Sequence, residues 1–265
     1  MFDLVTFGAD RIQLFLLLLM RVGGLMMTAP VFSHSSVPRR VALAMTLGFG
    51  VILLPLFIDT PLPQTGSLIM LVFFCLTEFL VGVVISLVFS VIFQSIRFAG
   101  AIVGYQIGFS MVNVVDPNSS EQVSVIGEFW FLLATLIFIC LNGHHLIITG
   151  LVDSYRAIPL GAGAPSGAVG EWLIKYSALV FVLGVKFAAP AILTVFLVDV
   201  AMGVLARTMP QMNIFIVGFP VKIYAGLAVV GLSLPAFSYL LTKITAGLDR
   251  ELAHLMKLYH LAGTV

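Results

Sequence analysis

Residues 68–93 read LIMLVFFCLTEFLVGVVISLVFSVIF, and this run decides the fold class of the chain. Glu78 is its one charged residue. A helix needs about 20 predominantly apolar residues to cross the hydrocarbon core of a bilayer. The run therefore predicts a membrane-spanning helix.

The rest of the chain has the same character. Of its 265 residues, 60% are hydrophobic and 9% are charged, and the mean hydropathy is +1.15. An average soluble domain has about 25% charged residues. Five further apolar runs lie at 12–31, 41–58, 123–141, 172–206 and 214–241, and the third of these could continue to residue 152. The sequence predicts an all-α, multi-helix integral membrane protein with kinked helical hairpins.

The connections between the runs are short and show no boundary between separate domains. Residues 159–170 form a linker rich in Gly, Ala and Pro, and Asn142-Gly143 is typical of a turn or a helix break. A tight turn with Arg207, Pro210 and Gln211 is expected between the last two runs. Pro190 is expected to kink the run 172–206. Cys75 and Cys140 lie in separate runs, so they are interpreted as two small buried side chains.

The segment GYQIGFSMVNVVDPNSSEQ, residues 104–122, fits neither a spanning helix nor a water-exposed loop. Its first half is too apolar for an exposed turn, and residues 116–120 are too rich in turn formers to stay helical. At membrane depth, irregular backbone is tolerated only where it is buried in protein or lines a cavity. We therefore expect the function here. Deformable apolar residues suit a pore seal, and ordinary core packing is an equal alternative.

Charged residues interrupt the apolar runs. They are Arg21, Glu78, Glu128, Lys175, Lys186 and Asp199. Each costs about 2.5–3.5 kcal/mol at the centre of a spanning helix on insertion scales. Two interpretations of these charges stay open. One is an ion or proton relay, and the other is pairing between helices or subunits. The presence of both signs favours pairing, in helices whose neighbours are protein rather than lipid.

Three glycines follow one another at helical spacing. Gly100, Gly104 and Gly108 lie at i, i+4 and i+8, which places them in one small-residue stripe on a helix. Such a stripe permits close approach of a second helix. Gly108 also borders the irregular segment, where it is a candidate hinge.

No pattern in the sequence predicts catalysis, a metal or a cofactor. The stretch Gly108-Phe109-Ser110-Met111 lacks the second glycine of a nucleophile elbow. His144 and His145 are neighbours, so on a helix they point about 100° apart. Metalloprotease, phosphate-loop and dinucleotide fingerprints do not occur. The net charge of +1 excludes a large basic surface for nucleic acid. We expect a protein that is not an enzyme.

Several motifs resemble, in the same order, those of the FliR family of flagellar export-gate proteins and its injectisome counterparts, the FliR/SctT family. They lie at residues 28–32 (TAPVF), 37–41 (VPRRV), 104–117, 141–144 (LNGH), 153–161 (DSYRAIPLG) and 209–220 (MPQMNIFIVGFP). The resemblance covers residues 12–241 and leans towards the flagellar members.

The resemblance implies a core subunit of a type III export gate in the bacterial inner membrane, within the flagellar basal body. Such a subunit packs with FliP and FliQ homologues in a helical hetero-oligomeric channel, with FlhB associated, and unfolded export substrates pass through. Residues 1–171 would be a FliP-like part, residues 172–241 a FliQ-like hairpin and residues 242–265 a tail without family pattern. No cofactor is implied, and the remaining contacts are with membrane lipid.

The resemblance also implies a role for the irregular segment, which in the family projects into the pore as a plug. The residues that match are Gly108, Phe109, Ser110, Met111, Val114, Val115, Asp116 and Pro117. Asn118 stands where flagellar members often have glycine, and asparagine also tolerates a left-handed backbone.

The charges within the runs would then serve subunit pairing. These are Arg21, Glu78, Glu128, Lys186 and Asp199. A secondary transporter with broken helices around a midplane site is the alternative function. It would require inverted repeats, and only one strongly interrupted segment and no clear repeat is found in the sequence.

Overall fold

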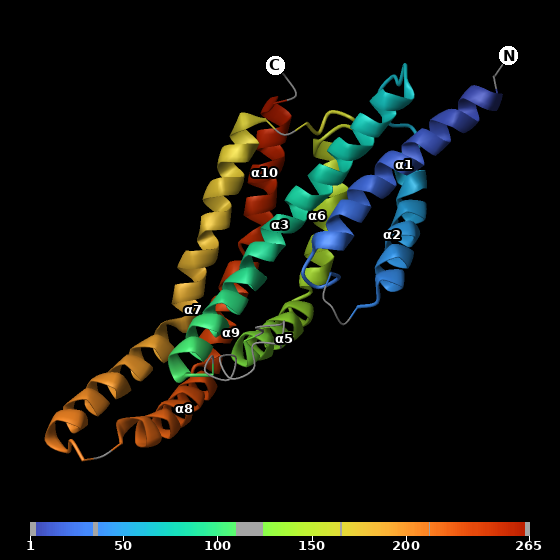
Figure 1. Ribbon diagram of the computed structural model, residues 1–265. Helices are drawn as coiled ribbons and strands as arrows, with labels where there is room; N and C mark the ends of the chain where they lie inside the picture. Colours follow the sequence, from blue (N-terminus) through green and yellow to red (C-terminus); the bar gives the residue numbers. More distant parts are fainter. Residues whose placement is uncertain (1–3, 34–36, 110–123, 165, 212, 263–265) are drawn as a thin grey trace. The chain divides into compact units, whose positions relative to one another are not determined.

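The computed structural model of the protein describes residues 4–33, 37–109, 124–164, 166–211 and 213–262 (Figure 1). All regular structure in these ranges is helical, which confirms the predicted all-α class. The longer helices are α1 (Leu4–Thr28), α2 (Arg39–Leu53), α3 (Leu68–Ile107), α5 (Val125–Cys140), α6 (Gly143–Ala157), α7 (Gly167–Thr208), α8 (Ile214–Leu232), α9 (Leu234–Thr245) and α10 (Leu248–Ala262). A short 3-10 helix, Leu54–Leu56, follows α2.

Four described helices are long and apolar enough to cross a membrane. They lie at Asp10–Thr28, Arg39–Leu56, Leu68–Ile107 and Gly167–Thr208. Two interrupted stretches, α5 with α6 and α8 with α9 and α10, raise the number to six if each is one span. The chain is a membrane protein by the length and composition of its helices.

Helices α3 and α7 extend beyond the predicted apolar runs. Helix α3 continues past residue 93 to Ile107, and Arg97 is accommodated there because it pairs with Glu128. Helix α7 begins at Gly167, within the predicted linker, because the Val169 amide donates to the Ser166 hydroxyl and so caps the first turn.

Cys75 is buried as expected, but Cys140 is exposed, so its predicted burial was wrong.

The break at Asn142-Gly143 is confirmed. Asn142 has a left-handed backbone, φ 58°, between α5 and α6. Asparagine adopts this conformation more readily than most residues. Helix α7, in contrast, is continuous through Pro190, and the kink expected there stays a prediction.

The chain divides into two compact units. The first contains Met1–Val91, Asn142–Ser177 and Gly247–Val265, and the second contains Ile92–Leu141 and Ala178–Ala246. Helices α3 and α7 contribute to both.

In the first unit α1 packs along α2, as Figure 1 shows, and α6 packs on α10. Helices α1 and α3 also cross at backbone distance. A Cβ atom on Gly82 would lie 2.1 Å from the Arg21 carbonyl oxygen, and one on Gly24 would lie 2.2 Å from that of Phe79. Only glycine fits at these two positions, and the close crossing brings the polar side chains of α1 and α3 together.

The second unit is built around aromatic side chains. The Phe93 ring of α3 meets the Phe131 ring of α5 edge-on, with centroids 5.5 Å apart. The Phe237 ring of α9 lies 5.6 Å from Trp130 and 5.1 Å from Phe187. Trp130 is completely buried. These contacts fix α5 against α3 and α9, and so position the crossing described next.

Candidate functional site

Helix α3 ends at a defined point just before the irregular segment. The Phe109 amide donates to the Gly104 carbonyl at 3.0 Å, and the Gly108 amide donates to the Tyr105 carbonyl at 3.1 Å. Gly108 has φ +98°. This pair of bonds with a left-handed residue is the Schellman C-cap, for which glycine is strongly preferred. The expected hinge position is thus the residue that terminates the helix.

Helix α5 begins on the other side of the segment and is tied to α3. The Ser124 hydroxyl accepts from the Gly127 amide at 3.1 Å, which caps α5, and donates to the Gly100 carbonyl at 2.9 Å. A Cβ atom on Gly100 would lie 2.2 Å from the Cα atom of Gly127. One on Gly104 would lie 2.9 Å from the Ser124 hydroxyl oxygen. Both predicted packing glycines therefore lie at this crossing, which holds the two ends of the segment together.

A charge pair continues the same crossing. Arg97 of α3 and Glu128 of α5 lie 3.6 Å apart with about a third of each side chain exposed. The Arg97 guanidinium also lies 3.9 Å from the centroid of the Phe131 ring. Here a predicted charge within an apolar run is paired inside the chain.

The structure describes only two of the predicted plug residues. Gly108 and Phe109 are half-buried, and a Cβ atom on Gly108 would meet the Phe219 ring of α8 at 3.0 Å. Ser110, Met111, Val114, Val115, Asp116 and Pro117 lie outside the described residues.

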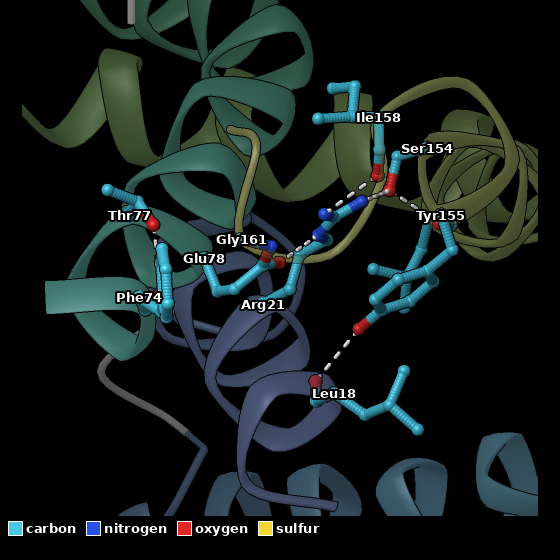
Figure 2. Close-up of polar contacts among 10 residues, drawn as sticks. Leu18, Arg21, Phe74, Thr77, Glu78, Ser154, Tyr155, Ile158 and Gly161 are labelled. Atoms are coloured by element: carbon cyan, nitrogen blue, oxygen red, sulfur yellow. Dashed lines mark hydrogen bonds and ion pairs between the residues drawn. The ribbon is translucent and has the colours of Figure 1, made fainter. Parts of the chain in front are cut away.

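A buried polar cluster lies in the first unit (Figure 2). The Arg21 side chain is fully buried, and its Nε atom donates to Glu78 Oε2 at 2.6 Å. Its other nitrogens donate to the Ser154 hydroxyl at 3.3 Å and to the Ile158 carbonyl at 3.1 Å. The guanidinium carbon lies 4.4 Å from the centroid of the Tyr155 ring. Each of the three side-chain nitrogens of Arg21 therefore has a hydrogen-bond acceptor.

The partner carboxylate is equally well satisfied. Glu78 Oε1 accepts from the Gly161 amide at 2.8 Å. The Tyr155 hydroxyl donates to the Leu18 carbonyl at 2.8 Å, as Figure 2 shows. The cluster therefore ties α1, α3, α6 and the turn after α6. Sequence reasoning singled out Arg21 and Glu78 but gave no sign that they meet, nor of Ser154 and Gly161, because contacts across more than 50 residues leave no local pattern.

The remaining predicted charges lie on α7. Asp199 forms an ion pair with Lys222 of α8. Sequence reasoning missed Lys222, although it is the one charged residue in the run 214–241 and could have been found on that ground. Lys175 pairs with Glu171 at 2.6 Å on the helix surface, and Lys186 is exposed.

The predicted hairpin turn connects α7 to α8. Arg207 is in the last turn of α7, and Pro210 and Gln211 are exposed beyond it. The Met209 amide donates to the Leu205 carbonyl at 2.8 Å, which closes the helix before the turn.

Comparison with known proteins supplies the family. The sequence model of the family described as "Bacterial export proteins, family 1" matches residues 12–248. The flagellar biosynthetic protein FliR of Bacillus subtilis (strain 168) is 31% identical over 217 residues, which cover 81% of this chain and 83% of the relative. FliR of Escherichia coli (strain K12) is 32% identical over 221 residues, 82% of each. FliR of Caulobacter vibrioides is 29% identical over 241 residues, 88% of this chain and 93% of the relative. The chain therefore belongs to the FliR family of bacterial export proteins.

Proposed function

We propose that this chain is a core subunit of the flagellar protein-export gate. With FliP and FliQ homologues it forms the channel through which unfolded flagellar subunits cross the inner membrane, and an FlhB homologue associates with it. The family match over residues 12–248 and the four to six candidate spans support a membrane component of the flagellar export apparatus. Residues 1–171 form the FliP-like part and residues 172–241 the FliQ-like hairpin of this proposal.

Within the channel, residues 108–117 act as the apolar seal that limits ion leak at rest. The observation that carries this role is that both ends of the segment are fixed by helix caps. The Schellman cap at Gly108 ends α3, and Ser124 starts α5 while bonded to the Gly100 carbonyl. A segment whose sequence is apolar and rich in turn formers, with its two ends fixed by crossed helices, is suited to line a cavity, where it meets no lipid. The chain itself performs no chemistry in this role.

The test deletes the proposed seal and keeps the two helix caps that flank it. Deleting residues 110–115 leaves both caps in place, and the variant is expressed together with the partner proteins. Membrane ion conductance is expected to rise, because an apolar constriction keeps water and ions out of a narrow pore. Secretion of flagellar subunits is measured in the same cells. Unchanged conductance together with unchanged export would rule out the seal.

Two controls distinguish the effect of the segment's length from the effect of its side chains. Replacing residues 110–115 by six Gly and Ser residues preserves the length of the segment and removes its apolar side chains, so it too should leak. Ser110→Ala should leave both export and conductance at the wild-type level, whereas an enzyme with a serine nucleophile would lose its activity.

A further inference from the structure

The end of α3 contacts one face of α8 at two points. A Cβ atom on Gly226 of α8 would lie 2.4 Å from the Cδ1 and Cγ1 atoms of Ile107, the last residue of α3. A Cβ atom on Gly108, the next residue, would lie 3.0 Å from the Phe219 ring of α8. Phe219 and Gly226 are two helical turns apart, so they lie on the same face of α8.

The contact at Gly226 leaves no room for a side chain. Gly226 is buried, and Ile107 is completely buried, so the Ile107 side chain is enclosed on its other sides as well. Protein interiors are close-packed, and extra carbon atoms inserted into such a contact force side chains or backbone to shift. The missing side chain at Gly226 therefore sets how closely α8 approaches the end of α3.

The Phe219 ring is packed less completely than Ile107. It is half-buried, and it lines a cavity of about 220 Å³ together with Met202 and Gly203 of α7. Because the cavity lies beside the ring, Phe219 contributes little core packing in that direction. Its contact with Gly108, in contrast, is made at the residue that terminates α3.

Helix α8 is tied to α7 close to Phe219. Lys222, one turn further along α8, forms an ion pair with Asp199 of α7. Residues three positions apart are neighbours on a helix surface. The ring of Phe219 is therefore presented to the end of α3 from a helix that is itself held in place.

We propose that Phe219 and Gly226 are positioning residues for the seal. They hold the end of α3, and so set the point from which the seal leaves this helix, while Ser124 and the crossing with α5 fix the other end of the segment. The proposal rests on the proposed function, which gives residues 108–117 the role of the seal. An apolar constriction keeps water out only while it is narrow, so a displaced starting point should open a path for ions.

The test measures the resting ion conductance of assembled, membrane-embedded complexes, with the partner proteins co-expressed. Gly226→Val displaces α8 from Ile107, and Phe219→Ala removes the ring that meets Gly108. Both variants are expected to raise the conductance per assembled complex several-fold, towards that of the 110–115 deletion. Secretion of flagellar subunits should continue, because neither change blocks the channel. A purely structural defect would instead lower assembly and secretion and leave the conductance of each assembled complex unchanged.

A compensating pair and a matched control give the result its specificity. Combining Gly226→Val with Ile107→Ala conserves the side-chain volume of the contact, and volume-conserving exchanges are tolerated best. The double variant is therefore expected to restore low conductance. Gly231→Val is the control on the same helix, because no atom lies within 4 Å of a Cβ atom there. It should keep the wild-type conductance. Phe219→Leu should leak less than Phe219→Ala, since it keeps part of the apolar side chain.

Each contrary outcome points to one cause. Wild-type conductance of the assembled Gly226→Val and Phe219→Ala complexes, beside a leaking 110–115 deletion, would overturn the positioning role and leave the seal standing. An equal leak in Gly231→Val, or no recovery with Ile107→Ala, would overturn the role of the contact between Gly226 and Ile107. A 110–115 deletion that does not leak would overturn the seal and the positioning role together. If Gly226→Val does not assemble, Gly226→Ala is measured with the same compensating and control changes.

Discussion

Arg21 is among the largest fully buried side chains of the protein, and its charge is compensated locally. Its carboxylate partner Glu78 is equally buried. Removing two charges from water is costly, and the cost is recovered only with good geometry and additional hydrogen bonds. Ser154, Ile158 and Gly161 supply those bonds. The pair is therefore a point where one substitution has a large effect.

Glu78→Gln should lower the free energy of unfolding by about 3–5 kcal/mol, because it leaves Arg21 buried without a counter-charge. Replacing both residues, as in Arg21→Leu with Glu78→Leu, should be less harmful than Glu78→Gln alone, because no charge is then left unpaired. Thermal or denaturant unfolding in detergent measures both effects.

Arg156→Gln provides the control for this pair. It breaks an exposed pair with Asp153 and should change stability by less than about 0.5 kcal/mol. If Glu78→Gln were as mild as Arg156→Gln, the buried pair would not support the first unit.

At the level of helices, the stop of α3 and the start of α5 are set by two small residues. Gly108 supplies the left-handed backbone that ends α3, and Ser124 supplies the hydroxyl that starts α5. Neither residue contributes much apolar area. Their effect lies in fixing where the irregular segment leaves and re-enters the helices.

Gly108→Ala should destabilise the end of α3 for two separable reasons. A left-handed backbone costs an L-residue about 1–2 kcal/mol. In addition, the new methyl group would meet the Phe219 ring at 3.0 Å. Phe219→Leu in the same chain should relieve the contact and leave the backbone cost.

Hydrogen exchange of the α3 C-terminal turn and unfolding of Gly108→Ala, with and without Phe219→Leu, distinguish the two contributions. Gly203→Ala is the control, because no atom lies within 4 Å of a Cβ atom there. It should be neutral or stabilising by up to about 1 kcal/mol, since alanine favours helix more than glycine does. Equal stability of Gly108→Ala and the wild type would contradict the assigned cap.

For the whole molecule, the C-terminal helix is the element that the family pattern does not explain. The family match ends at residue 248, where α10 begins. Helix α10 belongs to the first unit and packs on α6, with Leu252 over Gly150. Its opposite face carries exposed Arg250, His254 and Lys257. An amphipathic helix of this kind buries an apolar face that α6 would otherwise expose.

Leu252→Ala should therefore lower the stability of the first unit by about 2–5 kcal/mol, because it leaves a cavity between α10 and α6. Lys257→Ala, on the exposed face, should be close to neutral. Limited proteolysis of the full chain and its thermal unfolding report the difference. A neutral Leu252→Ala would show that α10 does not hold α6.

Features that depend on local composition could be predicted from the amino-acid sequence alone. The length and apolarity of runs such as 68–93 dictated membrane helices, since a span needs only enough consecutive apolar residues. The backbone preferences of Asn142 and Gly143 predicted a helix break. Motifs from residue 28 to residue 220 identified the family, and the comparisons confirmed it. Signals of this kind are read within a few neighbouring residues.

Contacts between distant residues, in contrast, became visible only in the folded chain. Arg21 and Glu78 are far apart in the sequence, and nothing near either one specifies the other. The contact of Gly100 with Gly127 and the packing of α10 on α6 are equally non-local. Within the described residues, the structure also showed which charges of the apolar runs pair inside the chain, as Glu128 with Arg97 and Asp199 with Lys222. The physical reason is that burial and pairing depend on how helices cross, and many sequences with the same apolar pattern allow different crossings.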